Sequence, residues 1–181
     1  LYGYRLRQGI GPLKKELGTP AKVHRFDDGY AAYAWKFADH VLVLETDNTR
    51  PDLVWAIQIE GKANPPEMGL EGINLGDTSD MVIKKLGRPD STENAMDEIS
   101  HEKMKDIVYY SYLETGNFSI EMTAGKVSSI KLQFNGPANT VVDDTHALDR
   151  FLREVKKGNR YRVASYLAAD VSISWKGKKF R

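Results

Sequence analysis

The chain has 181 residues, of which 41% are hydrophobic and 28% are charged, and its formal net charge is +1. This balance is typical of a folded globular protein, and the length allows one large domain or about two to three small ones. No apolar run approaches the length of a membrane-spanning helix. The absence of cysteine excludes disulfides, thiol chemistry and cysteine zinc sites.

The first 61 residues predict one helix followed by four strands. The helix covers about residues 10–17, and Gly18 and Pro20 end it, because glycine suits the left-handed C-terminal position and proline prevents continuation. Runs of alternating or β-branched residues, separated by short polar turns, then predict strands at residues 23–26, 30–37, 41–45 and 53–60. Such a meander with a helix on one face is an α+β layer pair.

Residues 62–71 read as a linker, and residues 72–136 repeat the same order of elements. Asp77, Thr78 or Ser79 can cap a helix that Gly87 and Pro89 end. A charge-rich insertion is expected at residues 91–105. The strands expected after it cover residues 107–113, 118–122 and 127–134.

The two segments match without a gap at an offset of 69 positions around the helix. The matching residues are Gly3 and Gly72, Leu6 and Leu75, Lys15 and Lys84, Leu17 and Leu86, Gly18 and Gly87, and Pro20 and Pro89. We therefore predict an internal duplication, with repeats at residues 1–61 and 72–136. Residues 144–181 predict a helix-helix-strand unit, which ends soon after its first strand and is expected to be incomplete.

The second repeat resembles the superfamily that holds the beta-lactamase inhibitory proteins and the small outer-membrane lipoproteins of the barrel-assembly machinery. The residues that carry the resemblance are Gly72, Leu75-Gly76, Val82, Leu86-Gly87, Pro89, Tyr110, Tyr112, Phe118 and Gly125-Lys126-Val127. The first repeat departs from the pattern, with Arg7 in place of the second glycine and Pro12 inside the helix. Two tandem copies imply the inhibitory-protein arrangement, in which helices back one continuous sheet.

The resemblance implies a fold and no particular activity, because every residue that carries it is structural. No inhibitor contact residue can be transferred to this chain. The C-terminal unit is similar to the opening of nuclear-transport-factor-2-like domains, at Phe151-Leu152, Gly158, Tyr166-Leu167 and Asp170-Val171. That similarity implies an alternative function, in which the C-terminal unit binds a small ligand or performs chemistry.

Aromatic residues on the predicted strands are the best candidates for a binding surface. Tyrosine and tryptophan dominate binding hot spots because they supply large contact areas at low entropic cost. The competing interpretation is that one face of each strand packs under the helix, which is the favoured role for Trp35 and Trp55. The candidate partner-binding residues are Tyr33, Trp35, Phe37, Tyr110 and Tyr112.

Charge is uneven along the chain, with a basic excess from Thr145 onward and an acidic excess before it. The basic tail is a weaker candidate for contact with phosphates or an anionic membrane. A solvated helix face that balances the acidic repeats is the favoured interpretation. A nucleic-acid partner is not expected, because exposed aromatic residues are not interleaved with the basic ones. The candidate contacts are Lys156, Lys157, Arg160, Lys178 and Lys179.

Catalytic motifs are absent from the sequence. There is no Gly-x-Ser-x-Gly elbow and no glycine-rich phosphate loop. Asp97 and His101 are four residues apart and could share a metal on a helix, but a solvated face explains them better. Asp143, Asp144 and His146 form a second such group, in which Asp144 or Thr145 is better explained as a helix cap. We predict no catalytic residue, metal or cofactor.

The duplication and the aromatic strands predict a non-enzymatic protein-binding or scaffold module, and the resemblance implies that it belongs to the bacterial envelope or exterior. Its expected location is periplasmic, lipoprotein-anchored or secreted. The chain begins at Leu1 rather than methionine, so a leader or an N-terminal anchor that places it near a membrane is part of this expectation. The expected partner is another protein, bound through an aromatic sheet face.

Overall fold

The computed structural model describes residues 1–27, 29–96, 103–114, 116–134, 173–175 and 178–180. The chain divides into two compact units, residues 1–135 and 136–181. In the second unit, β9 (Ile173–Trp175) pairs antiparallel with β10 (Lys178–Phe180). The helices expected between residues 144 and 169 lie outside the described residues.

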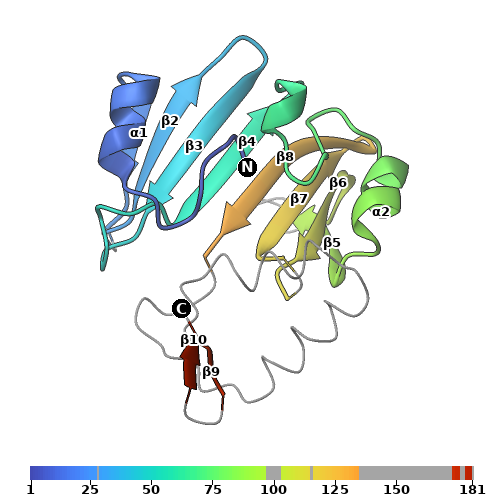
Figure 1. Cartoon of the computed structure of the whole chain (residues 1–181). Coiled ribbons are helices and arrows are strands. Elements are labelled where there is room, and N and C mark those ends of the chain that lie inside the picture. The colour runs from blue at the N-terminus through green and yellow to red at the C-terminus, as the bar shows by residue number, and fades with distance from the viewer. Residues whose placement is uncertain (28, 97–102, 115, 135–172, 176–177, 181) are drawn as a thin grey trace. The chain divides into compact units, whose positions relative to one another are not determined.

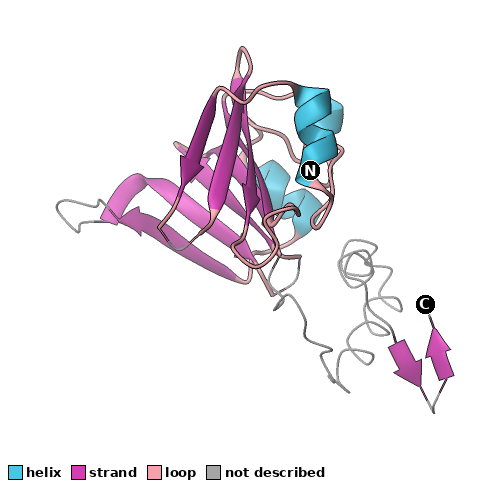
Figure 2. Ribbon diagram, turned by 90° about the vertical axis from the view of Figure 1, so that its left-hand side faces the viewer, coloured by secondary structure: helices cyan, strands magenta, loops and turns pink. Residues whose placement is uncertain are grey.

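The first unit is an α+β structure built on one eight-stranded antiparallel sheet, with strand order β1-β2-β3-β4-β8-β7-β6-β5. Both helices lie on the same side of this sheet (Figures 1 and 2). The elements are α1 (Ile10–Leu17), β1 (Lys22–Arg25), β2 (Ala31–Lys36), β3 (His40–Thr46), β4 (Ala56–Gly61), the 3₁₀ turn η1 (Pro66–Met68), α2 (Ser79–Leu86), β5 (Ser91–Met96), β6 (Lys103–Tyr112), β7 (Phe118–Thr123) and β8 (Lys126–Gln133).

The helix boundaries follow from local chemistry. Thr78 is the N-cap of α2, and its side chain accepts a hydrogen bond from the backbone N–H of Met81. Gly87 ends α2 with φ 83°, the left-handed conformation that glycine adopts without penalty. Pro12 lies in the first turn of α1, where a backbone N–H has no intrahelical acceptor, so the helix accommodates it.

The core lies between the sheet and the helices and runs through both halves of the unit. Alternate side chains of β2 and β3 are buried, as their period-two pattern predicts. The central strands β4 and β8 pair directly, with Ile59 opposite Ile130, and both side chains are fully buried. This contact joins the first four strands to the last four.

One expected insertion is instead part of the sheet. Residues 91–96 form β5, and β6 begins at Lys103, four residues before the expected start of its strand. β5 is an edge strand with mostly exposed side chains. Such a strand needs no apolar alternation, and its polar sequence therefore gave no strand signal.

Candidate protein-binding face

Three of the five predicted anchors are buried on the helix-covered face. The indole Nε1 of Trp35 donates a hydrogen bond of 3.0 Å to the carbonyl oxygen of Gly18, at the end of α1. The hydroxyl of Tyr112 donates one of 2.9 Å to the carbonyl oxygen of Gly87, at the end of α2. Tyr33 is also buried, and Lys14 Nζ of α1 lies 3.5 Å from its ring centroid. These three side chains hold helices to the sheet.

The other two predicted anchors lie apart from each other. Phe37 follows β2, is 37% exposed, and stacks on His40 with ring centroids 4.8 Å apart. Tyr110 lies on β6 at the other end of the sheet, is half-buried, and packs against the core. The five predicted anchors therefore do not form one exposed surface.

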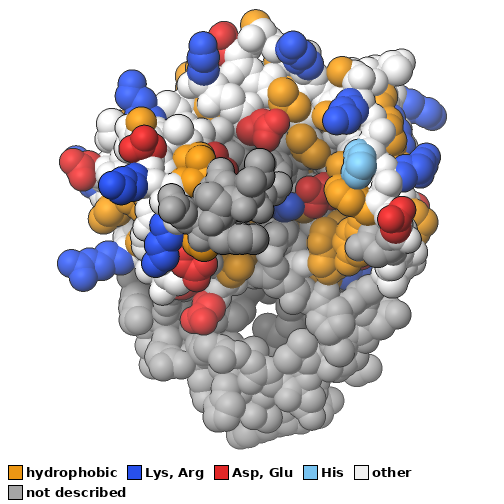
Figure 3. All heavy atoms as spheres, turned by 180° about the vertical axis from the view of Figure 1, so that it is seen from behind, with side chains coloured by type: hydrophobic (Ala, Val, Ile, Leu, Met, Phe, Trp, Pro, Cys, Tyr) orange, Lys and Arg blue, Asp and Glu red, His pale blue; other side chains and the backbone are white. Residues whose placement is uncertain are grey.

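The face opposite the helices has a different character, and we call it the open face. Strand registers place on it the side chains that alternate with the buried ones. Figure 3 shows this face, with hydrophobic side chains gathered over the part that β1, β2 and β3 form. Its central and outer side chains include Ala32, Ala34, Val41, Val43, Gln58, Tyr109, Ser111, Ser119, Glu121, Ser129 and Lys131.

The apolar part of the open face consists of small, half-buried side chains and one exposed aromatic ring. Ala32 and Ala34 on β2 are half-buried, and the half-buried valines of β3 stand beside them. Phe26, directly after β1, is 47% exposed and makes an edge contact with His24 at 4.3 Å. Phe26 was not predicted as a contact from the sequence, because it is a single aromatic residue after a short strand. The aromatic residues of β2 alternate with alanine, and this alternation places the small side chains on the open face.

The centre of the open face is polar and internally paired. Lys131 Nζ lies 3.0 Å from Glu45 Oε1 in an ion pair whose side chains are 30% and 22% exposed. Gln58 Nε2 donates a 3.0 Å hydrogen bond to Ser129 Oγ. Because Gln58 also pairs in register with Lys131, both interactions fix side chains at the junction of β4 and β8.

A second hydroxyl and carboxylate group extends the polar region toward β6. Ser128 Oγ donates a 2.8 Å hydrogen bond to Glu121 Oε1 and accepts one of 2.8 Å from Thr123 Oγ1. Tyr109 is 43% exposed. Partial burial, and then the neighbouring Glu121 carboxylate, raise the pKa of its phenol. These contacts orient the polar groups before any partner arrives.

The N-terminal segment is fastened to the helix-covered side by buried polar contacts. Tyr2 Oη lies 3.0 Å from His40 Nε2, and both side chains are buried. Burial lowers the pKa of His40, against the opposing effects of a hydrogen bond to the Ala63 backbone and of the Asp39 carboxylate. This group is a structural clasp, because its hydrogen bond joins two packed segments.

A neighbouring contact ties the same segment to α1. The hydroxyl of Tyr4 donates a 3.0 Å hydrogen bond to Glu16 Oε1. Burial, followed by the hydrogen bond and charge of Glu16, raises the pKa of Tyr4 to about 12. The phenol therefore stays protonated and keeps donating at any ordinary pH.

No group of three or more histidine, aspartate or glutamate side chains within the described ranges is arranged to hold a metal ion. His24 and His40 belong to different strands. The pair Asp97 and His101, and the group around Asp144, lie outside the described residues. Likewise, none of the helices that the structure describes is long and apolar enough to cross a membrane.

The weaker candidate contacts with an anionic surface fall on the second unit. Lys156, Lys157 and Arg160 lie outside the described residues. Lys178 and Lys179 belong to β10.

Comparison with known proteins finds no matching family model and no matching curated relative. Among solved structures, a cysteine-rich secretory protein from Staphylococcus aureus is 13% identical with a TM-score of 0.44, and the match covers 88% of this chain. A DUF4309 family protein from Bacillus subtilis is 16% identical with a TM-score of 0.44, over 70% of this chain and 78% of that one. A proposed beta-lactamase inhibitor protein from Streptococcus mutans is 17% identical with a TM-score of 0.28, over 71% of this chain and 83% of that one. The chain spans 60% of the length of the staphylococcal protein.

These similarities are too low to assign a family or an activity. What the fold itself establishes is an α+β class with a predominant antiparallel sheet.

Proposed function

We propose that residues 1–135 form a non-enzymatic protein-binding module that engages its partner through the open face of the sheet. The division of aromatic residues between the two faces carries this proposal. The helix-covered face uses Trp35 and Tyr112 to hold its helices, whereas the open face leaves Phe26 and Tyr109 exposed. Exposed aromatic rings offer a partner a large contact area, and the small side chains around them leave the rings accessible.

The polar centre of the open face supports the same function. Its ion pair and its hydrogen bonds are formed within the chain. The side chains that make them are therefore already fixed and lose little conformational freedom when a partner binds. The apolar part and the polar centre lie on the same face of neighbouring strands, β2 to β4 and β8. A partner that contacts both parts would bury an apolar anchor and meet fixed polar groups beside it. Of the residues predicted from sequence, Phe37 is partly exposed, but its ring packs against Tyr2 and His40 on the helix-covered side, so it is not part of this surface.

We further propose that the module arose by duplication of a helix-plus-four-strand unit. Matching hydrogen bonds support this origin: Arg7 N donates to Val54 O at 2.7 Å, and Gly76 N donates to Val127 O at 2.8 Å. Each bond joins the segment before a helix to a strand or loop near the end of its own half. The donors are separated by the same offset of 69 positions that the sequence match shows.

Backbone conformation at matching positions supports the duplication as well. Arg7 has φ 61°, in the left-handed region that the corresponding Gly76 occupies with φ 87°. The first half therefore keeps this backbone geometry although it has lost the glycine. The matching positions with positive φ are Tyr2 and Glu71, Gly3 and Gly72, Arg7 and Gly76, and Gly18 and Gly87.

The proposed location is the bacterial envelope or exterior, on the basis of the sequence resemblance to envelope lipoproteins and secreted inhibitors. A lipid anchor would place the module near a membrane and its proteins. Inhibition of a beta-lactamase is a narrower function that none of the contacts described above specifies. The proposed function is therefore that of an extracytoplasmic module that binds a protein partner.

Site-specific photo-crosslinking tests the proposal. A photoreactive residue at position 26 or 109 should capture a discrete protein from a bacterial envelope extract, and the same residue at Met81 should not. Met81 is a matched control because it is 41% exposed on the outer side of α2. The alanine substitutions Phe26→Ala and Tyr109→Ala should reduce capture by the other open-face position. Equal capture from position 81 would assign binding to another surface.

A further inference from the structure

The first strand, β1, is a free edge of the sheet. It pairs with β2 alone, and all four of its side chains are exposed. Phe26 N donates to Tyr30 O, and hydrogen-bonded pairs alternate along an antiparallel ladder. His24 and Lys22 therefore direct their peptide groups toward β2. Val23 and Arg25 direct theirs outward, where they can pair with another strand.

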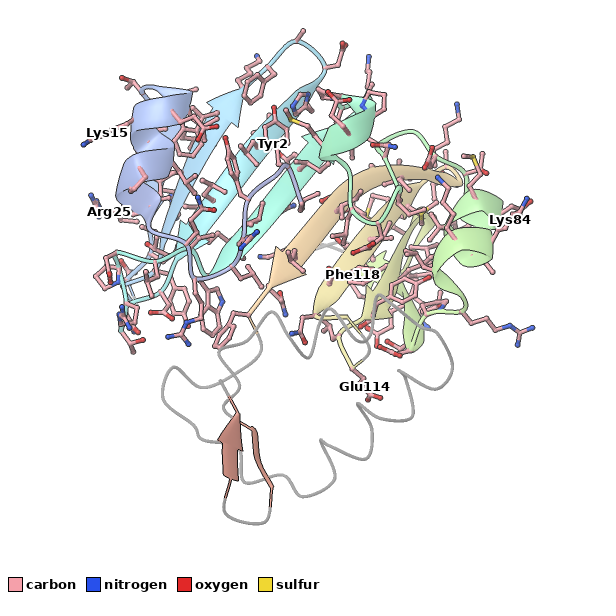
Figure 4. All side chains as sticks on the ribbon, in the orientation of Figure 1. Tyr2, Lys15, Arg25, Lys84, Glu114 and Phe118 are labelled. Atoms are coloured by element: carbon pink, nitrogen blue, oxygen red, sulfur yellow. The ribbon has the colours of Figure 1, made fainter. Side chains whose placement is uncertain are left out.

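Positive charge is concentrated along this edge. β1 itself carries two cations, Lys22 and Arg25, and the exposed carboxylate of Asp27 follows the strand. Lys14 of the adjacent helix lies 3.5 Å above the ring of Tyr33, the register partner of Val23. Figure 4 shows Lys15 of α1 and Arg25 on the same edge of the molecule. Within α1, the one carboxylate, that of Glu16, accepts a hydrogen bond from Tyr4.

The opposite edge of the same sheet lacks this charge. β5 is the other end strand, and it carries Ser91, Thr92, Glu93 and Asn94 at the offset of 69 positions from the residues of β1. Lysine and arginine are therefore not required by the edge position itself. Their presence on β1 also opposes the pairing of β1 with a second copy of itself, because like charges would stand opposite each other.

We propose that β1 binds an extended acidic segment of a partner protein, which adds to the sheet as a ninth strand. The outward peptide groups of Val23 and Arg25 supply backbone hydrogen bonds, as in other cases of strand addition. Alternation places the side chains of Lys22 and His24 on the same side of the sheet as the open face. The acidic side chains of the bound partner segment therefore lie on that side. Aliphatic side chains alternate with them and pack against Val23, which is 43% exposed on the helix side.

A labelled synthetic peptide tests this inference on the full chain. The probe is a hexapeptide of alternating glutamate and valine, measured by fluorescence anisotropy at low and high salt. It should bind with an affinity that falls as salt rises, because the contacts are exposed and charged. The alternating lysine and valine peptide should not bind. Equal binding of both peptides would overturn the inference.

Two substitutions, each with its own control, separate the charge contribution from the backbone contribution. Lys22→Glu should raise the Kd of the acidic probe at least about tenfold, and Ser91→Glu, at the matching position of β5, should leave it unchanged. Val23→Pro removes one outward N–H without touching the bonds to β2 and should abolish binding. Val23→Thr keeps that N–H and controls for the loss of the valine side chain, so it should still bind.

The results distinguish this surface from the open face. Tyr109→Ala weakens partner capture under the proposed function and should leave probe binding to β1 unchanged. Full probe binding by Val23→Pro would exclude strand addition. Lys22→Glu changes the net charge by two units and Ser91→Glu by one. A rise in log Kd with Ser91→Glu at least half as large as that with Lys22→Glu would therefore show a general charge effect and would also overturn the inference. So would concentration-dependent self-association of the chain without any binding of the acidic probe.

Discussion

Trp35 reaches from the sheet to the end of α1, where its indole N–H donates to the carbonyl oxygen of Gly18 at 3.0 Å. Tyr112 makes the corresponding contact in the second half, with its hydroxyl 2.9 Å from the carbonyl oxygen of Gly87. The last carbonyl groups of a helix have no partner within it. Each half thus uses an aromatic side chain of its sheet to satisfy a carbonyl where its helix ends.

The substitution Tyr112→Phe tests this role, because it removes the hydroxyl and keeps the ring. We expect the free energy of unfolding to fall by about 1 kcal/mol, as is typical for a lost side-chain hydrogen bond that leaves a carbonyl unsatisfied. Urea unfolding followed by circular dichroism would measure the change. Tyr109→Phe, on the open face, should stay within about 0.5 kcal/mol of the unmodified chain. Equal effects of the two substitutions would contradict the role.

The His40 clasp predicts how stability depends on pH. Burial lowers the pKa of His40 in the folded state, so the unfolded chain binds this proton more readily. Stability from this group is therefore complete above the unfolded pKa of about 6.5 and is lost as pH falls from there through the folded value. Urea midpoints should accordingly be lower at about pH 5.5 than at about pH 7.5.

The variant His40→Gln isolates this contribution, because glutamine does not titrate and can accept the Tyr2 hydrogen bond. It should show a flatter pH dependence than the unmodified chain over the same range. His24→Gln, on the exposed β1, should keep the original dependence. An unchanged slope in His40→Gln would assign the pH dependence to other groups.

Sequence reasoning could find both helices and every strand of the first unit except β5, because each of these has a local cause. Glycine at 18 and 87 ends the helices, and alternation in residues 31–36 and 40–46 marks strands. It could not decide which face of a strand the helix covers. Tyr33 and Trp35 share one face and Ala32 and Ala34 share the other, and either assignment fits the pattern alone. The binding anchors were therefore predicted on the face that the helices occupy.

The remaining differences also have physical causes. Arg7 adopts a left-handed conformation that the sequence associates with glycine, and hydrogen bonding of its backbone N–H to Val54 holds it there. The strand β5 carries an edge sequence with little hydrophobic signal. Phe26 is a single aromatic residue after a short strand, and its exposure depends on the free edge that tertiary pairing leaves. Such features depend on contacts far apart in the chain.

The junction of β4 and β8 predicts that the two halves unfold together. Ile59 and Ile130 face each other across it and are fully buried. Ile59→Ala should lower the free energy of unfolding by about 2–5 kcal/mol, through lost burial and the cavity left behind. Calorimetry should show one transition for residues 1–135, because the core crosses the junction. Two separate transitions would show that each half is stable alone.

Gly61 illustrates a close backbone contact that determines how β3 and β4 meet. A Cβ atom at this position would lie 2.3 Å from the carbonyl oxygen of Asp39 and 2.7 Å from the Cα of His40. Both neighbours are backbone atoms, and φ is +140°, so a side chain would meet a clash and conformational strain together. We expect Gly61→Ala to lower the free energy of unfolding by more than about 2 kcal/mol.

Gly11→Ala is the matched control, since nothing lies within 4 Å of its Cβ position in α1, and it should be neutral or stabilising by up to about 1 kcal/mol. Equal unfolding midpoints for the two variants in urea would show that the Asp39 backbone moves aside, and that this contact does not fix the pairing of β3 with β4.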